Sequence, residues 1–168
     1  AFVLVRTSEY RWKRVTSFLD PFADKLGDGY QIIQSLYAIG SGGIFGLGLG
    51  RSRQKFSYIP EPHNDFIFAI LCEELGLVGA MLVILLFTVL IWRGVRIALA
   101  APDKFGSYLA MGIMMLIAFQ VVLNIAVVTS SMPVTGVALP FFSYGGTSLV
   151  MIMSCMGIML NISSKGKE

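Results

Sequence analysis

Charge is the property that this sequence of 168 residues most clearly lacks. Only 14% of its residues are charged, against about 25% in an average soluble domain. No charged residue occurs between Phe105 and Ser164. A water-soluble domain cannot build its surface from such a stretch, and a composition that is 55% hydrophobic excludes a disordered chain. We therefore interpret the chain as an integral membrane protein, in agreement with its mean hydropathy of +0.74.

Residues that form disulfides or bind metals are also scarce, with two cysteines and one histidine. Cys72 and Cys155 lie in apolar surroundings far apart in the sequence, which predicts two unpaired thiols. His63 has no second His or Cys near it, so the sequence predicts no metal site. Nucleotide-binding fingerprints are missing as well. The net charge of +3 comes from bases that flank apolar segments, which favours lipid phosphates and not nucleic acid as partners.

Three long apolar segments remain, and each is long enough to cross a bilayer as a helix. We expect transmembrane spans at residues 66–92, 105–129 and 141–162. Residues 1–5 are interpreted as the end of a truncated preceding span, so the chain reads as the C-terminal fragment of a longer protein. The predicted fold is all-α: a polytopic transmembrane helix bundle of three full spans plus this tail, with a large extracytoplasmic loop that contains short helices.

The basic residues between and after the spans predict the orientation. They place the loop 93–104 and the tail 163–168 in the cytoplasm, so that residues 6–65 and 130–140 are extracytoplasmic. The long loop opposes this rule with eight Lys and Arg residues, but the rule weakens for loops of roughly 60 residues. Those bases therefore need another explanation.

The long loop contains a predicted helix near residues 30–39, followed by a run rich in glycine. Ile32, Ile33, Leu36 and Ile39 share one helical face, while Gln31, Gln34 and Ser35 lie opposite. This pattern predicts an amphipathic helix on the membrane surface. Two interpretations of the glycines in 40–50 stay open: a connector or close helix contact, and a hinge past which a substrate chain slides.

Candidate chemistry concentrates where the chain enters the first span. Asp65 follows two prolines and falls in the first turn of the expected helix. It is either a carboxylate favoured by the helix dipole or a general base at the membrane surface. Glu73 and Glu74 lie two turns further on, where acidic groups usually face a cavity or a partner.

Further candidates are bases in the long loop and small residues before the last span. The bases are either headgroup anchors or a site for pyrophosphate or a lipid headgroup. The small residues either allow close helix packing or shape a cavity wall. These candidates are Arg11, Arg14, Arg51, Arg53 and Lys55 for the bases, and Ser143, Tyr144, Gly145 and Gly146 for the cavity wall.

Five separated motifs make the chain resemble one family over its whole length. They are Tyr10–Pro21, Gly29–Ser35, Pro60–Phe68 with Glu73-Glu74-Leu75-Gly76, Pro133–Gly136, and Leu139–Gly146. The sequence is similar to the C-terminal part of SEDS proteins (shape, elongation, division and sporulation), nearest to the FtsW/SpoVE branch. It departs from the family pattern at residues 129–132, where a glycine is usual, and at Asn64, where Thr is common.

The resemblance implies a peptidoglycan glycosyltransferase of the bacterial cytoplasmic membrane that polymerises lipid II, an undecaprenyl-pyrophosphate-linked precursor, during division or sporulation. The family's essential acidic residue lies in its H-x-D-F motif and corresponds to Asp65, and we count His63 of the same motif among the candidates for binding substrate or pyrophosphate. Implied partners are a class B penicillin-binding protein transpeptidase, divisome or spore-cortex proteins, and membrane lipids. No cofactor is implied with certainty, and a divalent cation could assist the leaving group. The alternatives are a lipid II flippase and a non-catalytic scaffold for the cell-wall synthase.

Overall fold

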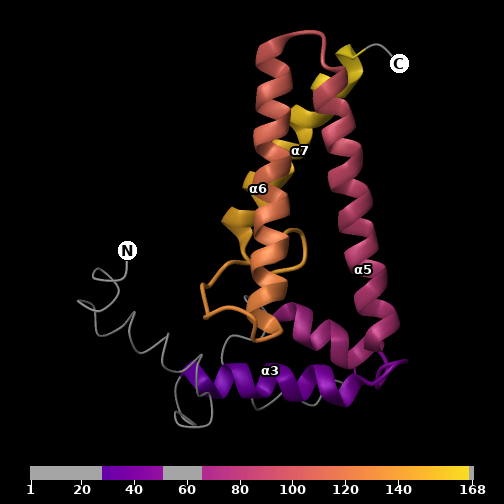
Figure 1. Ribbon diagram of the computed structural model, residues 1–168, viewed down its shortest axis with the longest axis vertical. Coiled ribbons are helices and arrows are strands. Elements are labelled where there is room, and N and C mark those ends of the chain that lie inside the picture. Colours follow the sequence, from indigo (N-terminus) through magenta and orange to yellow (C-terminus); the bar gives the residue numbers. More distant parts are fainter. Residues whose placement is uncertain (1–27, 51–65, 167–168) are drawn as a thin grey trace, which may run out of the picture.

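The computed structural model describes residues 28–50 and 66–166, and within these ranges it is built from helices (Figure 1). The first helix, α3, spans Asp28–Gly42. Three longer helices follow: α5 at Ile67–Ala100, α6 at Lys104–Val128 and α7 at Gly146–Lys165. All three are long and apolar enough to cross a membrane. The prediction of a polytopic helical bundle is thereby confirmed.

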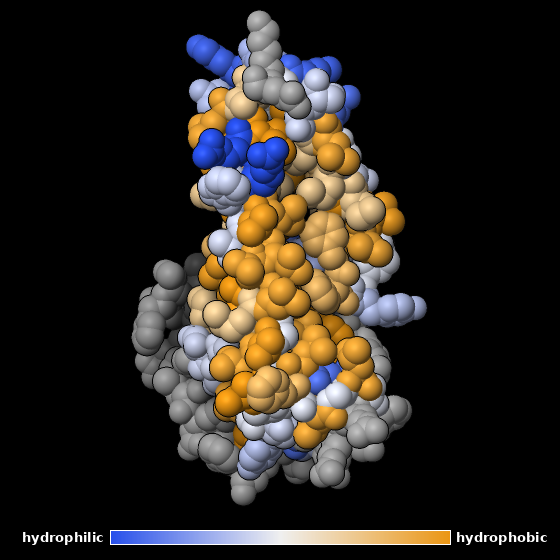
Figure 2. Space-filling model, turned by 90° about the vertical axis from the view of Figure 1, so that its right-hand side faces the viewer, coloured by the Kyte–Doolittle hydropathy of each residue, from blue (hydrophilic) through white to orange (hydrophobic). Residues whose placement is uncertain are grey.

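The three long helices stand together, and α3 lies across one end of them (Figure 1). α5 and α6 run alongside each other and are in contact, and α7 touches both. In Figure 2, hydrophobic side chains cover the middle of the face shown, and hydrophilic ones gather toward its upper end. This distribution suits a bundle whose middle faces lipid and whose ends face headgroups and water.

α5 is too long for one straight crossing and is broken near its beginning. A straight helix of 34 residues would measure about 51 Å, whereas the hydrocarbon core is about 30 Å thick. Gly76 adopts a non-helical conformation with φ 67° and ψ −166°. The section before Gly76, residues 67–75, runs beside α3, and the section after it turns to stand beside α6 (Figure 1). We call residues 67–75 the arm.

The ends of the helices differ from the predicted span limits. α5 continues past the predicted limit, through Arg93 and Arg96, to Ala100. Arginines are compatible with this last part of the helix because their long side chains can extend to the headgroup region. The Arg96 guanidinium stacks over Trp92, 5.1 Å from the ring centroid. α7 begins at Gly146 and not at residue 141, since the chain first turns at Phe141, where φ is +67°.

α3 packs against protein, which changes the predicted assignment of its faces. Ser35, predicted to lie on the polar face, is completely buried, and Leu36, predicted to lie on the apolar face, is exposed. The Ser35 hydroxyl hydrogen-bonds the carbonyl of Ile32 (2.8 Å) and that of Val128 in α6 (3.2 Å). A small polar residue fits this contact because it allows close approach and still satisfies its hydroxyl.

Candidate functional site at the broken helix

The residues predicted to carry the chemistry lie largely outside the described part of the chain. These are Asp65 together with Arg11, Arg14, Arg51, Arg53, Lys55 and His63. Five of them lie within residues 51–65, and the structure describes the chain on either side of this segment, up to Gly50 and again from Phe66. The site is therefore built here from the elements that flank it: the arm, the glycine-rich loop 43–50, and the turn before α7.

The arm is a well-packed element that begins two residues after Asp65 in the sequence. Phe66, the residue before its first turn, is 2% exposed. Its inward side is formed by buried side chains: Phe68, Ala69, Ile70, Cys72 and Glu73. The position of the arm is thus fixed by packing against α3 and the core.

At Gly76 the break leaves backbone groups that an unbroken helix would pair internally, and loop 43–48 pairs with them instead. The carbonyl oxygen of Glu73 accepts from the N–H of Leu47 at 3.0 Å, and that of Glu74 accepts from the N–H of Gly48 at 3.0 Å. On the other side of the break, the N–H of Leu77 donates to the Gly43 carbonyl at 2.9 Å. The N–H of Val78 donates to the Ile44 carbonyl at 3.2 Å. Backbone groups at membrane depth need such partners, since each unsatisfied one costs several kcal/mol.

Glycines make this pairing possible because the two backbones touch. A Cβ atom added at Gly42 would collide with the carbonyl of Cys72, and one at Gly46 with the carbonyl of Glu74. A Cβ atom at Gly76 would collide with the backbone of Ile44 and Gly46. Of the two interpretations of the glycine run, the close helix contact describes Gly42 and Gly46.

The two acidic residues of the arm have different surroundings. Glu73 is 1% exposed and lies on the buried side. Glu74 is partly exposed and lines a cavity of about 280 Å³ beside the arm, otherwise lined by apolar residues: Leu49, Ile67, Ile70, Leu71, Leu75 and Phe142. Glu74 thus faces a cavity, one of the two possibilities for an acidic group at this depth.

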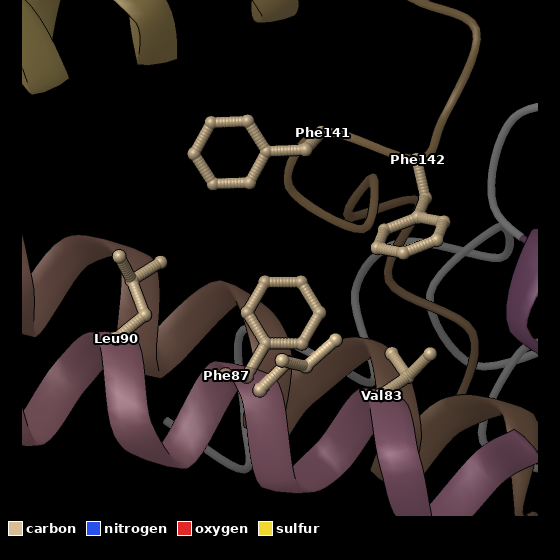
Figure 3. A pocket seen from close by; sticks show the side chains of 6 residues that line it. Val83, Phe87, Leu90, Phe141 and Phe142 are labelled. Carbon is tan, nitrogen blue, oxygen red and sulfur yellow. The ribbon is translucent and has the colours of Figure 1, made fainter.

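A second cavity, of about 240 Å³, lies further along α5 and is lined by apolar side chains alone. Val83, Phe87 and Leu90 face it from α5, with Phe141 and Phe142 opposite on the turn before α7 (Figure 3). The rings of Phe87 and Phe142 are tilted against each other with centroids 6.0 Å apart. Because Phe142 lines both cavities, they adjoin at this residue. Chemically, the pair suits a hydrocarbon chain with a polar group near Glu74.

The turn that carries Phe142 is held by hydrogen bonds of small and polar residues. The hydroxyl of Ser143 accepts from the N–H of Leu139 at 2.7 Å. Asn124 of α6, which is buried, donates from Nδ2 to the carbonyl of Val137 at 2.8 Å. This bond ties the segment that connects α6 and α7 to α6 itself.

The small residues before α7 were interpreted either as packing residues or as a cavity wall, and the structure places them as follows. Ser143 closes the turn, and Tyr144 is 85% exposed. Gly145 is the N-cap of α7, and Gly146 is its first residue. None of the four lines the two cavities described above. The adjacent aromatic residues Phe141 and Phe142 do, and sequence reasoning did not select them because aromatic residues before a span usually indicate a headgroup anchor.

Among residues 28–50 and 66–166, no group of three or more His, Cys, Asp or Glu side chains could hold a metal ion.

Sequence reasoning also missed the helix break at Gly76. A single glycine in an apolar helical segment gives no signal for a break, whereas its partner loop lies far away in the sequence.

Together, the three spanning helices and the interrupted entry of α5 define a multi-pass helical membrane protein. The sequence model of the FtsW/RodA/SpoVE family, described as "Cell cycle protein", matches residues 1–168. The chain belongs to this family, which confirms the resemblance to SEDS proteins.

Named relatives agree with the family assignment. The chain is 61% identical over 160 residues to "Stage V sporulation protein E" of Bacillus subtilis (strain 168), covering 95% of this chain and 44% of that protein. It is 52% identical over 161 residues to "Probable peptidoglycan glycosyltransferase FtsW" of Trichlorobacter lovleyi, covering 96% of this chain and 42% of that protein. The chain thus spans less than half the length of these relatives.

Solved structures share the arrangement. One, described as "Structural coordination of polymerization and crosslinking by a peptidoglycan synthase complex", matches with a TM-score of 0.76 and 35% identity over 99% of this chain and 45% of that one. The crystal structure of the Thermus thermophilus rod shape determining protein RodA matches with a TM-score of 0.60 and 35% identity, over 80% of this chain and 40% of that one.

Proposed function

We propose that the complete protein is a peptidoglycan glycosyltransferase that polymerises lipid II into glycan strands during division or sporulation. The observation that carries this proposal is the 52% identity, over 96% of the chain, to a relative named as such a transferase. The fragment by itself is expected to be inactive, because the chain spans less than half the length of that relative.

In the proposed reaction, Asp65 is the general base. The acceptor is the 4-hydroxyl of a sugar on one lipid II molecule, which is a weak nucleophile. A carboxylate that takes its proton contributes about 10² to 10⁴-fold to the rate. The hydroxyl oxygen forms the new glycosidic bond as the bond from the donor sugar to its pyrophosphate breaks, and the lipid pyrophosphate leaves.

Bases of the long loop are proposed to bind that pyrophosphate. Arg51 and Arg53 stand nearest to Asp65 in the sequence, with Lys55 and His63 between them and it. Arginine binds phosphate through two parallel hydrogen bonds, and the positive charge stabilises the leaving group. Arg11 and Arg14 are proposed to contribute from the start of the loop, and a divalent cation could share this role.

The described residues support a lipid-linked substrate in particular. The two adjoining cavities are almost entirely apolar, and Glu74 lies in the lining of the cavity that the arm borders. A hydrocarbon chain can occupy such a space, while the polar part of the same molecule stays at the end of α5 that follows Asp65. This division matches a substrate with a polyprenyl tail and a sugar headgroup.

We further propose a bacterial cytoplasmic-membrane location with loop 6–65 outside and the C-terminus in the cytoplasm. A transpeptidase of the class B penicillin-binding type is the proposed partner, since one structural neighbour is described as coordinating polymerization and crosslinking. Divisome or spore-cortex proteins are the wider context. Labelling of single cysteines at residues 131 and 165 with a membrane-impermeant reagent on intact cells tests the orientation, and only the first should react.

The function is tested with purified full-length protein, its transpeptidase partner and labelled lipid II. Glycan strands should form, and Asp65→Asn should abolish them while expression and partner binding stay intact. Asp103→Asn is the matched control, because it makes the same substitution beyond the other end of α5. Asp103 is the N-cap of α6, and Asn caps a helix about as well as Asp does. Near-normal polymer from Asp65→Asn would refute the general-base role.

A lipid II flippase is the second candidate, and the broken α5 is the observation that favours it. Discontinuous helices form substrate sites in many transporters, usually near the bilayer midplane. Here the break lies close to the beginning of α5, and loop backbone satisfies its open groups. Transbilayer movement of labelled lipid II without polymer formation would decide for the flippase.

A further inference from the structure

The charged residues of the described chain are separated between the two ends of the bundle. Three of the four acidic residues within 28–50 and 66–166 lie in α3 and the arm: Asp28, Glu73 and Glu74. All four basic residues of these ranges lie toward the opposite end, where hydrophilic side chains gather in Figure 2: Arg93, Arg96, Lys104 and Lys165. The only acidic residue of residues 77–166 is Asp103, whose carboxylate accepts from the N–H of Gly106 at 2.7 Å as the N-cap of α6.

The bases of three helices meet at this end of the bundle. A Cβ atom added at Gly166, which follows α7, would lie 3.3 Å from the carbonyl oxygen of Ala100, the last residue of α5. Lys165 is the last residue of α7, and Lys104 is the first of α6, which residues 101–103 connect to α5. Figure 1 accordingly shows the C-terminal part of α7 beside the connection between α5 and α6.

Arg93 lies on the side of α5 that is turned toward α7. Residues seven apart share a face of a helix, so Arg93 is in line with Leu86 and Ala100. Leu86 lines the cavity that Phe141 and Phe142 border from the turn before α7, and Ala100 meets the end of α7. Arg93 lies between these two contacts and is exposed.

Arg93 also lies deeper along α5 than an ordinary headgroup anchor. From the break at Gly76 to Arg93 the helix rises about 26 Å, whereas the hydrocarbon core is about 30 Å thick. An ionised side chain at this depth is costly, so it extends toward the surface and takes a partner there. Arg96, one turn further on, differs in its surroundings because its guanidinium lies 5.1 Å from the ring centroid of Trp92.

We propose that Arg93 and Lys165 bind the phosphate of an anionic phospholipid where the ends of α5 and α7 meet, with Lys104 adding positive charge from α6. Basic clusters at the ends of spanning helices bind anionic headgroups, and a guanidinium can hold a phosphate through two parallel hydrogen bonds. A lipid fits better than an acidic protein, because neighbouring apolar side chains are open to the hydrocarbon: Leu99 is 72% and Phe105 76% exposed. This inference requires a membrane location and does not depend on the proposed glycosyl transfer.

The test titrates the purified full-length protein in detergent with dioleoylphosphatidylglycerol and counts the bound lipid by native mass spectrometry. Dioleoylphosphatidylcholine, which has the same chains and no net charge, is the control lipid. The parent should bind phosphatidylglycerol at least about tenfold more tightly. Arg93→Gln should weaken that binding about 10- to 100-fold, because a hydrogen bond to a charged group is lost, and Lys165→Gln about fivefold. Binding of phosphatidylcholine should stay unchanged in both variants.

Arg96→Gln is the matched control, because it removes the same charge one turn further along α5, from the face that carries Trp92. It should weaken phosphatidylglycerol binding by no more than about fivefold, the share of one nearby charge. Arg93→Lys retains the charge and should still weaken binding, since lysine cannot form the paired contact. If Arg93→Gln does not fold, Arg93→Lys is the variant that decides.

Three results would overturn the inference. Equal losses in Arg93→Gln (or, where it decides, Arg93→Lys) and Arg96→Gln would show that this end attracts anionic lipids only through its total charge. Equal affinity of the parent for the two lipids would exclude an anionic-lipid site. An equal fall of the unfolding temperature of Arg93→Gln in phosphatidylcholine and in phosphatidylglycerol would show that Arg93 instead pairs with a carboxylate elsewhere in the complete protein. None of these results changes what Asp65→Asn says about the proposed function.

Discussion

Ser35 of α3 hydrogen-bonds the backbone carbonyl of Val128, at the last residue of α6, with 3.2 Å between the two oxygens. This contact joins the helix that crosses the end of the bundle to a membrane span. Val128 lies in the last turn of α6, where carbonyls lack a partner within the helix. The hydroxyl therefore satisfies a helix end and holds α3 in place.

Replacing this serine should loosen α3. We expect Ser35→Ala to destabilise the protein by about 1 kcal/mol, because a buried carbonyl loses one of its partners. Ser35→Leu should destabilise it more, since the site is completely buried and has no room for the larger side chain. Thermal unfolding in detergent measures both. Ser41→Ala is the control, because Ser41 is exposed and its hydroxyl donates to the carbonyl of Ala38 within α3; an equal loss there would contradict the role of the contact with α6.

The loop arginines are expected to determine the use of lipid II. Arg51→Ala and Arg53→Ala should each slow polymerisation at limiting substrate roughly 10- to 100-fold, because a hydrogen bond to a charged group contributes about 1.5–3 kcal/mol. Lysine should restore only part of the rate, since it cannot form the paired contact.

The measurement for these arginines is the initial rate against lipid II concentration. Arg96→Ala is the control, as this arginine stacks on Trp92 near the other end of α5. If Arg51→Ala and Arg53→Ala both behave like the control, the loop bases are surface anchors and the pyrophosphate is bound elsewhere in the complete protein.

We predict that replacing Phe142 lowers the stability of the protein, whereas replacing Tyr144 does not. Phe142→Ala removes the tilted ring pair with Phe87 and merges the two cavities, so we expect a loss of about 1 kcal/mol. Tyr144 is 85% exposed, and its replacement by Ala should change stability by less than about 0.5 kcal/mol. Unfolding midpoints of the two variants test this. A smaller shift for Phe142→Ala than for Tyr144→Ala would contradict the assignment of the cavity wall.

The cysteines are expected to differ in reactivity. Both are free thiols, Cys72 buried in the arm and Cys155 partly exposed on α7. A maleimide added to the folded protein should label Cys155 first, and both should label after denaturation without a reductant. Intact mass measures the number of labels. A species that accepts none after denaturation would indicate a disulfide and refute the prediction.

Hydropathy was enough to predict the three spans, because a helix that crosses the hydrocarbon core needs about 20 consecutive, predominantly apolar residues. The same reasoning failed at Ser35, where burial depends on a contact with the distant residue Val128. It also could not find the break at Gly76, since the loop that satisfies it lies about thirty residues earlier. For Asp65 and the loop bases, which lie outside the described residues, the assignment remains a prediction from the sequence and the family resemblance.

The main-chain nature of the joint between loop 43–48 and the break at Gly76 has a consequence for how this region can evolve. Its four hydrogen bonds involve no side chain, so Ile44 and Phe45, which are exposed, can be exchanged without weakening it. Mutation can thus alter the exposed surface of the loop while the glycines preserve its joint with α5. Saturation mutagenesis of this loop should accordingly give a sharp contrast: wide tolerance at these two positions and almost none at Gly46.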